Sequence, residues 1–195
     1  MKMKAICLFC GSNKGAKPEY EAAARLLGHT LAEQGITLVY GAGNVGLMGV
    51  AADAALAAGG RVVGVIPEFL KAKEVAHLGL SELHVTETMH QRKALMAELS
   101  DGFIALPGGF GTFDELFEIL TWAQLSVHSK PVGLLDVRGF FQPLQSMVDH
   151  AVTEGFVPSG NLQLFQRDDS LPALLDWMRR YQPRPVPKWL DLSKT

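Results

Sequence analysis

A glycine-rich segment with the composition of an anion-binding turn occupies residues 107–112, Pro-Gly-Gly-Phe-Gly-Thr. It follows the apolar run 102–106 and precedes a segment of helical character. Backbone N–H groups at a helix start, with the helix dipole behind them, favour a phosphate, and Thr112 adds a hydroxyl donor that could also cap the helix. The alternative is a strand-to-helix turn whose glycines serve only tight packing. The candidate phosphate-binding residues here are Gly108, Gly109, Gly111 and Thr112.

A carboxylate lies one helical turn beyond this segment. Glu115 is three residues after Thr112 and directly follows Asp114. Carboxylates in a first helical turn are ordinary partners of the helix dipole, so a purely structural role is an open alternative. Beside a bound phosphosugar, however, a carboxylate could stabilise the positive charge that develops at the anomeric carbon and activate a water molecule. Glu115 is therefore a candidate catalytic residue for cleavage of a glycosidic bond.

Two adjacent cations, Arg92 and Lys93, lie near the start of a predicted helix at 88–100. Positive charge there opposes the helix dipole, so these residues do not serve helix stability. The guanidinium of Arg92 could form a fork to a phosphate or a ribose oxygen. Lys93 points about 100° away around the helix and is the weaker candidate. The alternative for both is a solvated face with a salt bridge.

A second glycine loop, Gly41–Gly46, satisfies the pattern G-x-G-x-x-G between a predicted strand and a predicted helix. The pattern alone is weak evidence for a dinucleotide-dependent reductase, because the acidic residue expected after the next strand is missing unless Glu68 serves. We favour a loop that shapes one mononucleotide pocket and includes Gly43. The turn at Gly11 and Ser12 after the first strand could complete the phosphate site, or it could be only a turn.

Strands and helices alternate along the chain. Strands are predicted at 4–10, 36–40, 61–66, 83–86, 102–106, 131–135 and 162–167, and helices at 18–34, 45–58, 88–100, 112–127, 141–154 and 171–181. Segment 68–80 is irregular. This alternation predicts an α/β fold, a mostly parallel sheet with helices on both faces. Ligands in such sheets bind beyond the carboxyl ends of the strands, at a switch in strand order, which the loops after Gly11, Gly41, Pro67 and Pro107 would form.

The length of 195 residues fits one domain, which we expect at 1–181, followed by a proline-rich tail at 182–195. A net charge of −2 without a basic cluster argues against a nucleic-acid partner. No apolar run reaches the ~20 residues of a membrane span, and the N-terminal stretch lacks the cleavage site of a signal peptide, so we expect a cytoplasmic protein. Cys7 and Cys10, if on a strand, point to opposite faces and form no redox or zinc pair.

These motifs together resemble those of the LONELY GUY (LOG) family. The segment 107–115 is similar to its PGGxGTxxE signature, and Arg92-Lys93 within 89–93 is similar to the other half of that signature. The segments 9–12, 41–49 and 121–125 are also similar to the family, and the resemblance extends from Lys4 to about Met178. Ala42 stands where members commonly have glycine, and Asp114 replaces a frequent glutamate.

The resemblance implies a Rossmann-like, doubly wound fold and cytokinin riboside 5′-monophosphate phosphoribohydrolase activity. Such an enzyme hydrolyses N6-modified AMP, and often AMP itself, to free base and ribose 5-phosphate without a metal or organic cofactor. It also implies a homodimer with its sites near the subunit interface. By the same resemblance, Arg92 and Glu115 are the catalytic pair, Gly108, Gly109, Gly111 and Thr112 hold the phosphate, and Glu74, Lys93 and Thr121 line the substrate site.

Two other functions are to be weighed against this hydrolase. A nucleotide-binding module without catalysis could use the same loops, and a reductase rests only on the fingerprint at Gly41–Gly46. Members of the family were long labelled lysine decarboxylases. That reaction normally needs a lysine that binds pyridoxal phosphate, and no lysine in this sequence lies in a recognisable setting for one.

Overall fold

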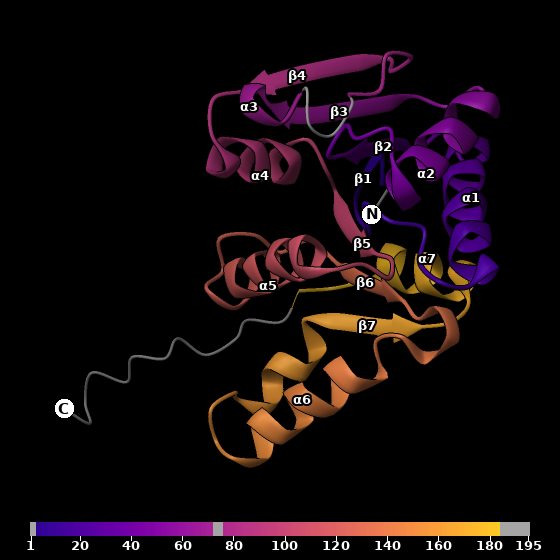
Figure 1. The fold of residues 1–195 in the computed structure, drawn as a ribbon. Helices are drawn as coiled ribbons and strands as arrows, with labels where there is room; N and C mark the ends of the chain where they lie inside the picture. The colour runs from indigo at the N-terminus through magenta and orange to yellow at the C-terminus, as the bar shows by residue number, and fades with distance from the viewer. Residues whose placement is uncertain (1–2, 72–75, 184–195) are drawn as a thin grey trace.

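The computed structural model describes residues 3–71 and 76–183 and has a parallel sheet at its centre (Figure 1). Its seven strands lie in the order β4-β3-β2-β1-β5-β6-β7, and every pairing is parallel. The strands are β1 (Ala5–Phe9), β2 (Thr37–Tyr40), β3 (Val62–Pro67), β4 (Glu82–Thr86), β5 (Gly102–Ala105), β6 (Val132–Leu135) and β7 (Phe165–Asp168). This is the α/β, doubly wound fold that the alternation of elements predicts.

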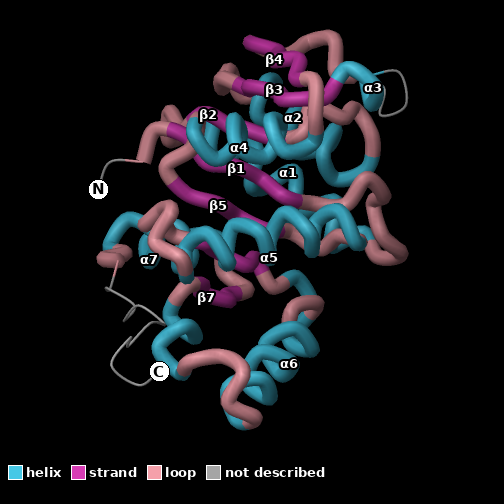
Figure 2. The backbone as a smooth tube through the Cα atoms, turned by 90° about the vertical axis from the view of Figure 1, so that its left-hand side faces the viewer, coloured by secondary structure: helices cyan, strands magenta, loops and turns pink. Residues whose placement is uncertain are grey.

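Helices cover both faces of the sheet (Figure 2). One face packs against α1 (Pro18–Glu33), α2 (Gly46–Ala57) and α7 (Leu171–Arg180), and the other against α4 (Met89–Glu98), α5 (Phe110–Gln124) and α6 (Gln142–Thr153). The short elements are α3 (Glu68–Lys71), η1 (Val137–Gly139) and η2 (Ser159–Gln163). Within the described ranges, no helix has the length and apolar character to cross a membrane.

The alternation of side chains along β1 divides the core into two layers. Ile6 and Leu8 pack under α1 and α2, whereas Cys7 and Phe9 pack under α4 and α5. Cys10 belongs to the first layer, so the two cysteines lie on opposite faces, as the period of a strand predicts. Both thiols are buried and free.

The strand order reverses between β1 and β5. From β1 the chain proceeds outward to β4, then returns through α4 to β5 and proceeds outward in the other direction to β7. The loops after β1 and β5 therefore leave the same edge side by side, and the Gly11 amide donates a hydrogen bond to the Pro107 carbonyl at 3.1 Å. A ligand site is expected at this switch point.

Two predicted elements have boundaries that differ from those of the structure. The strand predicted at 162–167 starts only at Phe165, because residues 159–163 form the 3-10 helix η2. The helix predicted at 112–127 runs from Phe110 to Gln124, with Gly109 rather than Thr112 at its N-cap position. Gly111 lowers the helix propensity of the first turn, yet the turn forms.

The N-terminus of α4 is fixed by a capping box. The Thr88 hydroxyl accepts a hydrogen bond from the Gln91 amide at 3.2 Å, and the Gln91 side chain accepts one from the Thr88 amide at 3.2 Å. Thr88 is thus the N-cap residue of α4. Thr86 instead donates its hydroxyl hydrogen to the Thr88 carbonyl.

We predict that Thr88→Ala lowers the free energy of unfolding by about 1 kcal/mol, because it leaves the Gln91 amide without its cap. Urea denaturation followed by circular dichroism measures the change. Thr153→Ala is a matched control, because its exposed hydroxyl only bonds a carbonyl four residues earlier in α6. Equal stability of the Thr88→Ala variant and the unmodified protein would contradict the capping role.

Candidate active site

The segment 107–112 forms the turn from β5 into α5. Gly109 is at the N-cap position of α5 and, because it has no side chain, makes no side-chain cap hydrogen bond. The start of α4, by contrast, is closed by Thr88 and Gln91. The first amides of α5 are therefore available to an anion in the way expected for a phosphate loop.

The glycines of this loop are required for different reasons. A Cβ on Gly108 would lie 2.7 Å from the Thr112 Cβ and 2.8 Å from the Gly11 amide nitrogen, so packing within the chain excludes a side chain there. Nothing lies within 4 Å of a Cβ built on Gly109 or Gly111. Packing therefore does not explain these two glycines, whereas a ligand that approaches the backbone would. Thr112 is 3% exposed and faces Gly108 from the first turn.

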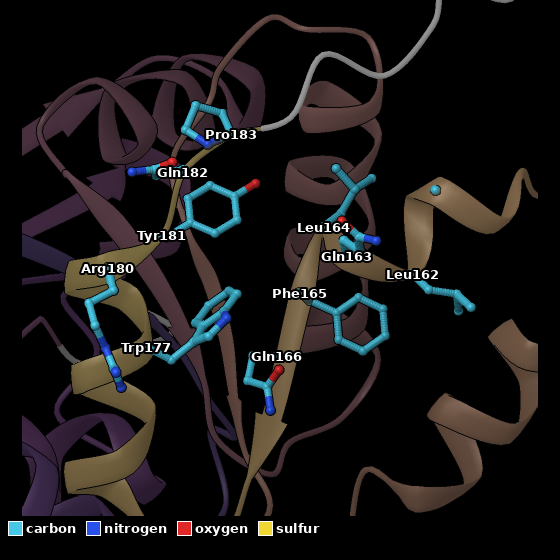
Figure 3. A pocket seen from close by; sticks show the side chains of 11 residues that line it. Leu162, Gln163, Leu164, Phe165, Gln166, Trp177, Arg180, Tyr181, Gln182 and Pro183 are labelled. Carbon is cyan, nitrogen blue, oxygen red and sulfur yellow. The ribbon is translucent and has the colours of Figure 1, made fainter.

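A cavity of about 180 Å³ lies between the loops after β1 and β5. Gly11, Ser12, Gly108 and Gly109 line it together with Tyr20 and Phe140. A larger cavity of about 680 Å³ lies where η2, the start of β7 and the end of α7 meet, and Phe165, Trp177 and Tyr181 line it (Figure 3). That cavity is near the amino end of β7, away from the carboxyl edge, so size alone does not identify the active site.

Arg92 is buried at the carboxyl edge of the sheet. It is 4% exposed, and its Nε donates to the Val65 carbonyl at 3.1 Å while Nη2 donates to the Gly41 carbonyl at 3.0 Å. Val65 lies on β3, and Gly41 follows β2. The alternative of a solvated cation is therefore wrong for Arg92, because a buried guanidinium held by two backbone carbonyls has a fixed orientation.

Lys93 points from α4 to α5. Its Nζ lies 3.1 Å from a carboxylate oxygen of Asp114 and 2.9 Å from one of Glu118, and its side chain is 11% exposed. Burial lowers the pKa of the Lys93 ammonium, but the carboxylates of Glu118 and Asp114 raise it more, and the net shift is upward. Lys93 therefore stays charged and joins the two helices that carry Arg92 and Glu115.

Glu115 lies partly buried on α5, and its charge affects the pKa values of the Cys7 and Cys10 thiols. Burial raises the pKa of the Cys7 thiol well above its ordinary value, the Glu115 carboxylate raises it further, and the Arg92 guanidinium lowers it. Burial and the Glu115 carboxylate also raise the pKa of Cys10. Because such effects fall with distance, Arg92 and Glu115 both lie within electrostatic range of one thiol on β1.

The loop from Gly41 to Gly46 is engaged with the rest of the protein. Gly43 forms a β-bridge with Ala76, and the Leu47 amide, at the start of α2, donates to the Gly11 carbonyl at 3.0 Å. In a dinucleotide site the helix start after this fingerprint would face a pyrophosphate. Because the Leu47 amide is already bonded within the protein, this loop argues against the reductase. Gly43 lies beside Ala76.

Of the residues assigned to the substrate site by resemblance, one is not described by the structure and another lies away from the glycine loop at the start of α5. Glu74 lies outside the described residues. Thr121 is exposed on α5, where its hydroxyl donates to the Phe117 carbonyl at 2.7 Å. It lies nine residues beyond Thr112, about 14 Å along the helix.

Other residues at the site were not anticipated from the sequence. Phe140 stacks on Phe113 with ring centroids 6.3 Å apart and meets the edge of Tyr20, forming an aromatic wall next to the loop. The carbonyls of Gly41 and Val65 and the carboxylate of Glu118 were also missed. No sequence pattern identifies a backbone carbonyl as the partner of a distant arginine, although the first glycine of the fingerprint pointed to a close approach at Gly41.

Comparison with known proteins identifies close relatives of this chain. Residues 48–178 match a family described as possible lysine decarboxylase. Cytokinin riboside 5′-monophosphate phosphoribohydrolase LOG2 of Arabidopsis thaliana is 46% identical over 183 residues, which cover 94% of this chain and 86% of the relative. The enzyme LOG of Oryza sativa subsp. japonica, which has the same activity name, is 51% identical over 156 residues, 80% of this chain and 64% of the relative.

Solved structures with the same fold are more distant in sequence. The molybdenum cofactor carrier protein of Chlamydomonas reinhardtii superposes with a TM-score of 0.70 at 20% identity over 92% of this chain and 100% of its own. The molybdenum cofactor binding protein of Rippkaea orientalis gives 0.65 at 22% identity over 92% and 98%. At these identities the likeness concerns the fold alone. The identity and coverage of the phosphoribohydrolase relatives, by contrast, show that this chain belongs to the LONELY GUY (LOG) family.

Proposed function

We propose that this protein hydrolyses the N-glycosidic bond of purine nucleoside 5′-monophosphates, with adenosine or N6-substituted adenosine as the nucleoside. The products are the free base and ribose 5-phosphate. The main observation is that Arg92, buried at the carboxyl edge of the sheet, and the Glu115 carboxylate, one turn beyond the glycine-capped start of α5, both act electrostatically on the Cys7 thiol of β1. The phosphoribohydrolase names of relatives 46–51% identical to this chain support the same activity.

The 5′-phosphate is the anchor of the proposed complex. The first-turn amides of α5, with Gly109 and Gly111 free of side chains, donate to its oxygens, and the Thr112 hydroxyl contributes from the same turn. Gly11 and Ser12 border the loop from the β1 side. With the phosphate held there, the ribose extends along the first turn of α5 and C1′ reaches the level of Glu115.

The reaction breaks the bond between C1′ and N9 of the purine and forms a bond from a water oxygen to C1′. Positive charge develops at C1′ as the base leaves with the bonding electrons, and the Glu115 carboxylate stabilises that charge. The same carboxylate accepts a proton from the attacking water. N9 takes up a proton to give the neutral base. Arg92 orients the ribose phosphate or assists the departure of the purine.

Glu115→Gln and Arg92→Ala are each expected to lower kcat for release of adenine from AMP by at least about 10²-fold, because each removes a charge that acts in the transition state. Chromatography of the products of AMP, N6-isopentenyl-AMP and other nucleoside monophosphates measures the activity. Adenosine, which lacks the anchoring phosphate, is expected to give little or no adenine.

Circular dichroism and thermal unfolding show whether each variant is folded, and Glu98→Gln, an exposed carboxylate near the end of α4, serves as the matched control. Near-normal turnover by Glu115→Gln would contradict the role of that carboxylate. Nucleotide binding by the unmodified protein without base release from any nucleotide of the panel would favour a binding module instead.

Lys93 borders the proposed site and joins its two helices. Its ion pairs with Asp114 and Glu118 hold α5, and with it Glu115, against α4. Glu118 is 22% exposed at its side chain, so its charge is costly without a counter-ion. We propose that Lys93, through these pairs, sets the distance between Arg92 and Glu115. The substrate site is also proposed to include Glu74, Gly43 and Thr121.

Lys93→Met is expected to lower kcat for AMP by about tenfold, equivalent to about 1.4 kcal/mol, with a smaller change in KM. Adding Glu118→Gln should restore part of the loss, because it removes the carboxylate that the first change leaves without its partner. Steady-state kinetics of the two single variants and the double variant measure the coupling. A rise in KM with no restoration by Glu118→Gln would show that Lys93 acts by direct contact with substrate.

The protein is also proposed to act as a homodimer with sites near the subunit interface. The end of α5 and the turn after it expose apolar side chains, Leu125 at 62% and Val127 at 67%, and Thr121 is exposed on the same helix. Trp122, by contrast, packs against the core. A dimer built on this face would cover the two exposed apolar residues and bring Thr121 to the interface.

Leu125→Glu is expected to convert the dimer to a monomer, because it puts a charge into the apolar contact. Size-exclusion chromatography with light scattering measures the mass. Leu26→Glu changes a similarly exposed leucine, 53% exposed, on α1 and should leave the dimer intact. A monomeric unmodified protein would refute the homodimer, and a dimeric Leu125→Glu variant would refute this face.

A further inference from the structure

The first glycine of the fingerprint lies against the Arg92 guanidinium. A Cβ built on Gly41 would be 1.9 Å from Nη2 and 3.0 Å from Cζ of Arg92. Gly41 is buried, and its φ lies outside the left-handed region that favours glycine. The guanidinium is therefore the group that excludes a side chain at this position, rather than the conformation of the backbone.

Backbone carbonyls fix the plane of the same guanidinium. Arg92 Nη2 donates to Gly41 and Nε donates to Val65, and these residues lie on neighbouring, paired strands of the sheet or directly after them. The spacing of the two carbonyls is thus set by the sheet itself. A planar guanidinium bound at two of its nitrogens has a fixed orientation, which the single ammonium of a lysine could not reproduce.

Other contacts of the loop also connect protein to protein. A Cβ on Gly46 would lie 2.5 Å from the Asn13 amide nitrogen, so the β1 loop packs directly on this glycine. The Leu47 amide is bonded to Gly11, and Gly43 is bridged to Ala76. Gly46 is thus explained by its positive φ of 60° and by close packing of the β1 loop, and Gly41 is explained by the space that Arg92 needs.

We propose that Gly41 is a positioning residue for Arg92, leaving room for the guanidinium and orienting it through its carbonyl together with that of Val65. The expected effect of Gly41 on kcat rests on the proposed hydrolase function. The expected effect of Gly41 on the orientation of the Arg92 guanidinium does not. The G-x-G-x-x-G segment of this protein then serves to seat a catalytic arginine, and the nucleotide phosphate binds elsewhere, at the start of α5.

Gly41→Ala tests this role. The atoms that a new methyl group would meet belong to the end of a flexible side chain, so the fold should persist while the guanidinium moves. A displacement of about 1 Å is expected to lower kcat for AMP by about 10²-fold. Because Gly41 acts through Arg92, adding Gly41→Ala to Arg92→Ala should cause no further loss. Gly160→Ala, in η2 with open space around its Cβ, should keep normal activity and stability.

A second readout does not depend on catalysis. The Nε–H proton of Arg92, bonded to Val65 in a buried position, should give a slowly exchanging signal in a proton–nitrogen NMR spectrum, assigned by its loss in Arg92→Lys. Gly41→Ala should shift that signal or make its exchange fast. If the unmodified protein hydrolyses no nucleotide, the proposed function is wrong. The NMR measurement still shows whether Gly41 orients the Arg92 guanidinium. An unchanged signal, or a further loss of activity in the double variant, would overturn the proposal.

Discussion

The parallel pairing of β1 with β5 is the constraint on which the site depends. Parallel strands are joined by crossover connections, which are right-handed. From β1 the crossovers proceed toward one side of the sheet and from β5 toward the other, so their helices lie on opposite faces. At this junction the loops after β1 and β5 lead to helices on opposite faces, α1 and α5. The hydrogen bond from Gly11 to Pro107 joins these loops directly and sets the geometry of the phosphate turn.

Two adjacent cations of α4 are compensated in different ways. Arg92 donates hydrogen bonds from Nε and Nη2 to backbone carbonyls of Val65 on β3 and of Gly41 after β2. Lys93 is bound by the full charges of Asp114 and Glu118. The first arrangement fixes the orientation of a guanidinium, whereas the second uses the charge of Lys93 to hold two helices together.

The two glycine loops likewise have different physical origins. The loop before α5 contains Gly109 and Gly111, where the chain itself has room for side chains, so the open backbone faces outward. In the loop before α2, Gly41 packs against Arg92 and Gly46 packs against the β1 loop. Similar patterns in the sequence therefore give one loop with open space around its glycines and one loop packed against the protein interior. The packed loop is the one with the better-known fingerprint.

Much of this protein was determined by local sequence alone. Apolar runs such as 36–40 and 102–106 have the composition of strands buried on both faces, and Thr88 with Gln91 has the chemistry of a helix cap. The segment 107–112, followed by Glu115, predicted both a helix start and a candidate site, because its chemistry is contained in consecutive residues. The boundaries near Gly111 and Gln163 failed where local propensity competes with packing or with a 3-10 turn.

Only the tertiary structure decided which distant groups meet. Arg92 is 51 residues from the Gly41 carbonyl and 27 from that of Val65, and Lys93 is 21 from Asp114. Backbone carbonyls are present in every residue, so no residue type marks the one that will bind a guanidinium. The sequence could name the arginine and the glycine separately. Their contact follows from the register of β2 with β3 and from the crossing of α4 over that edge, which pairing and packing of the whole sheet determine.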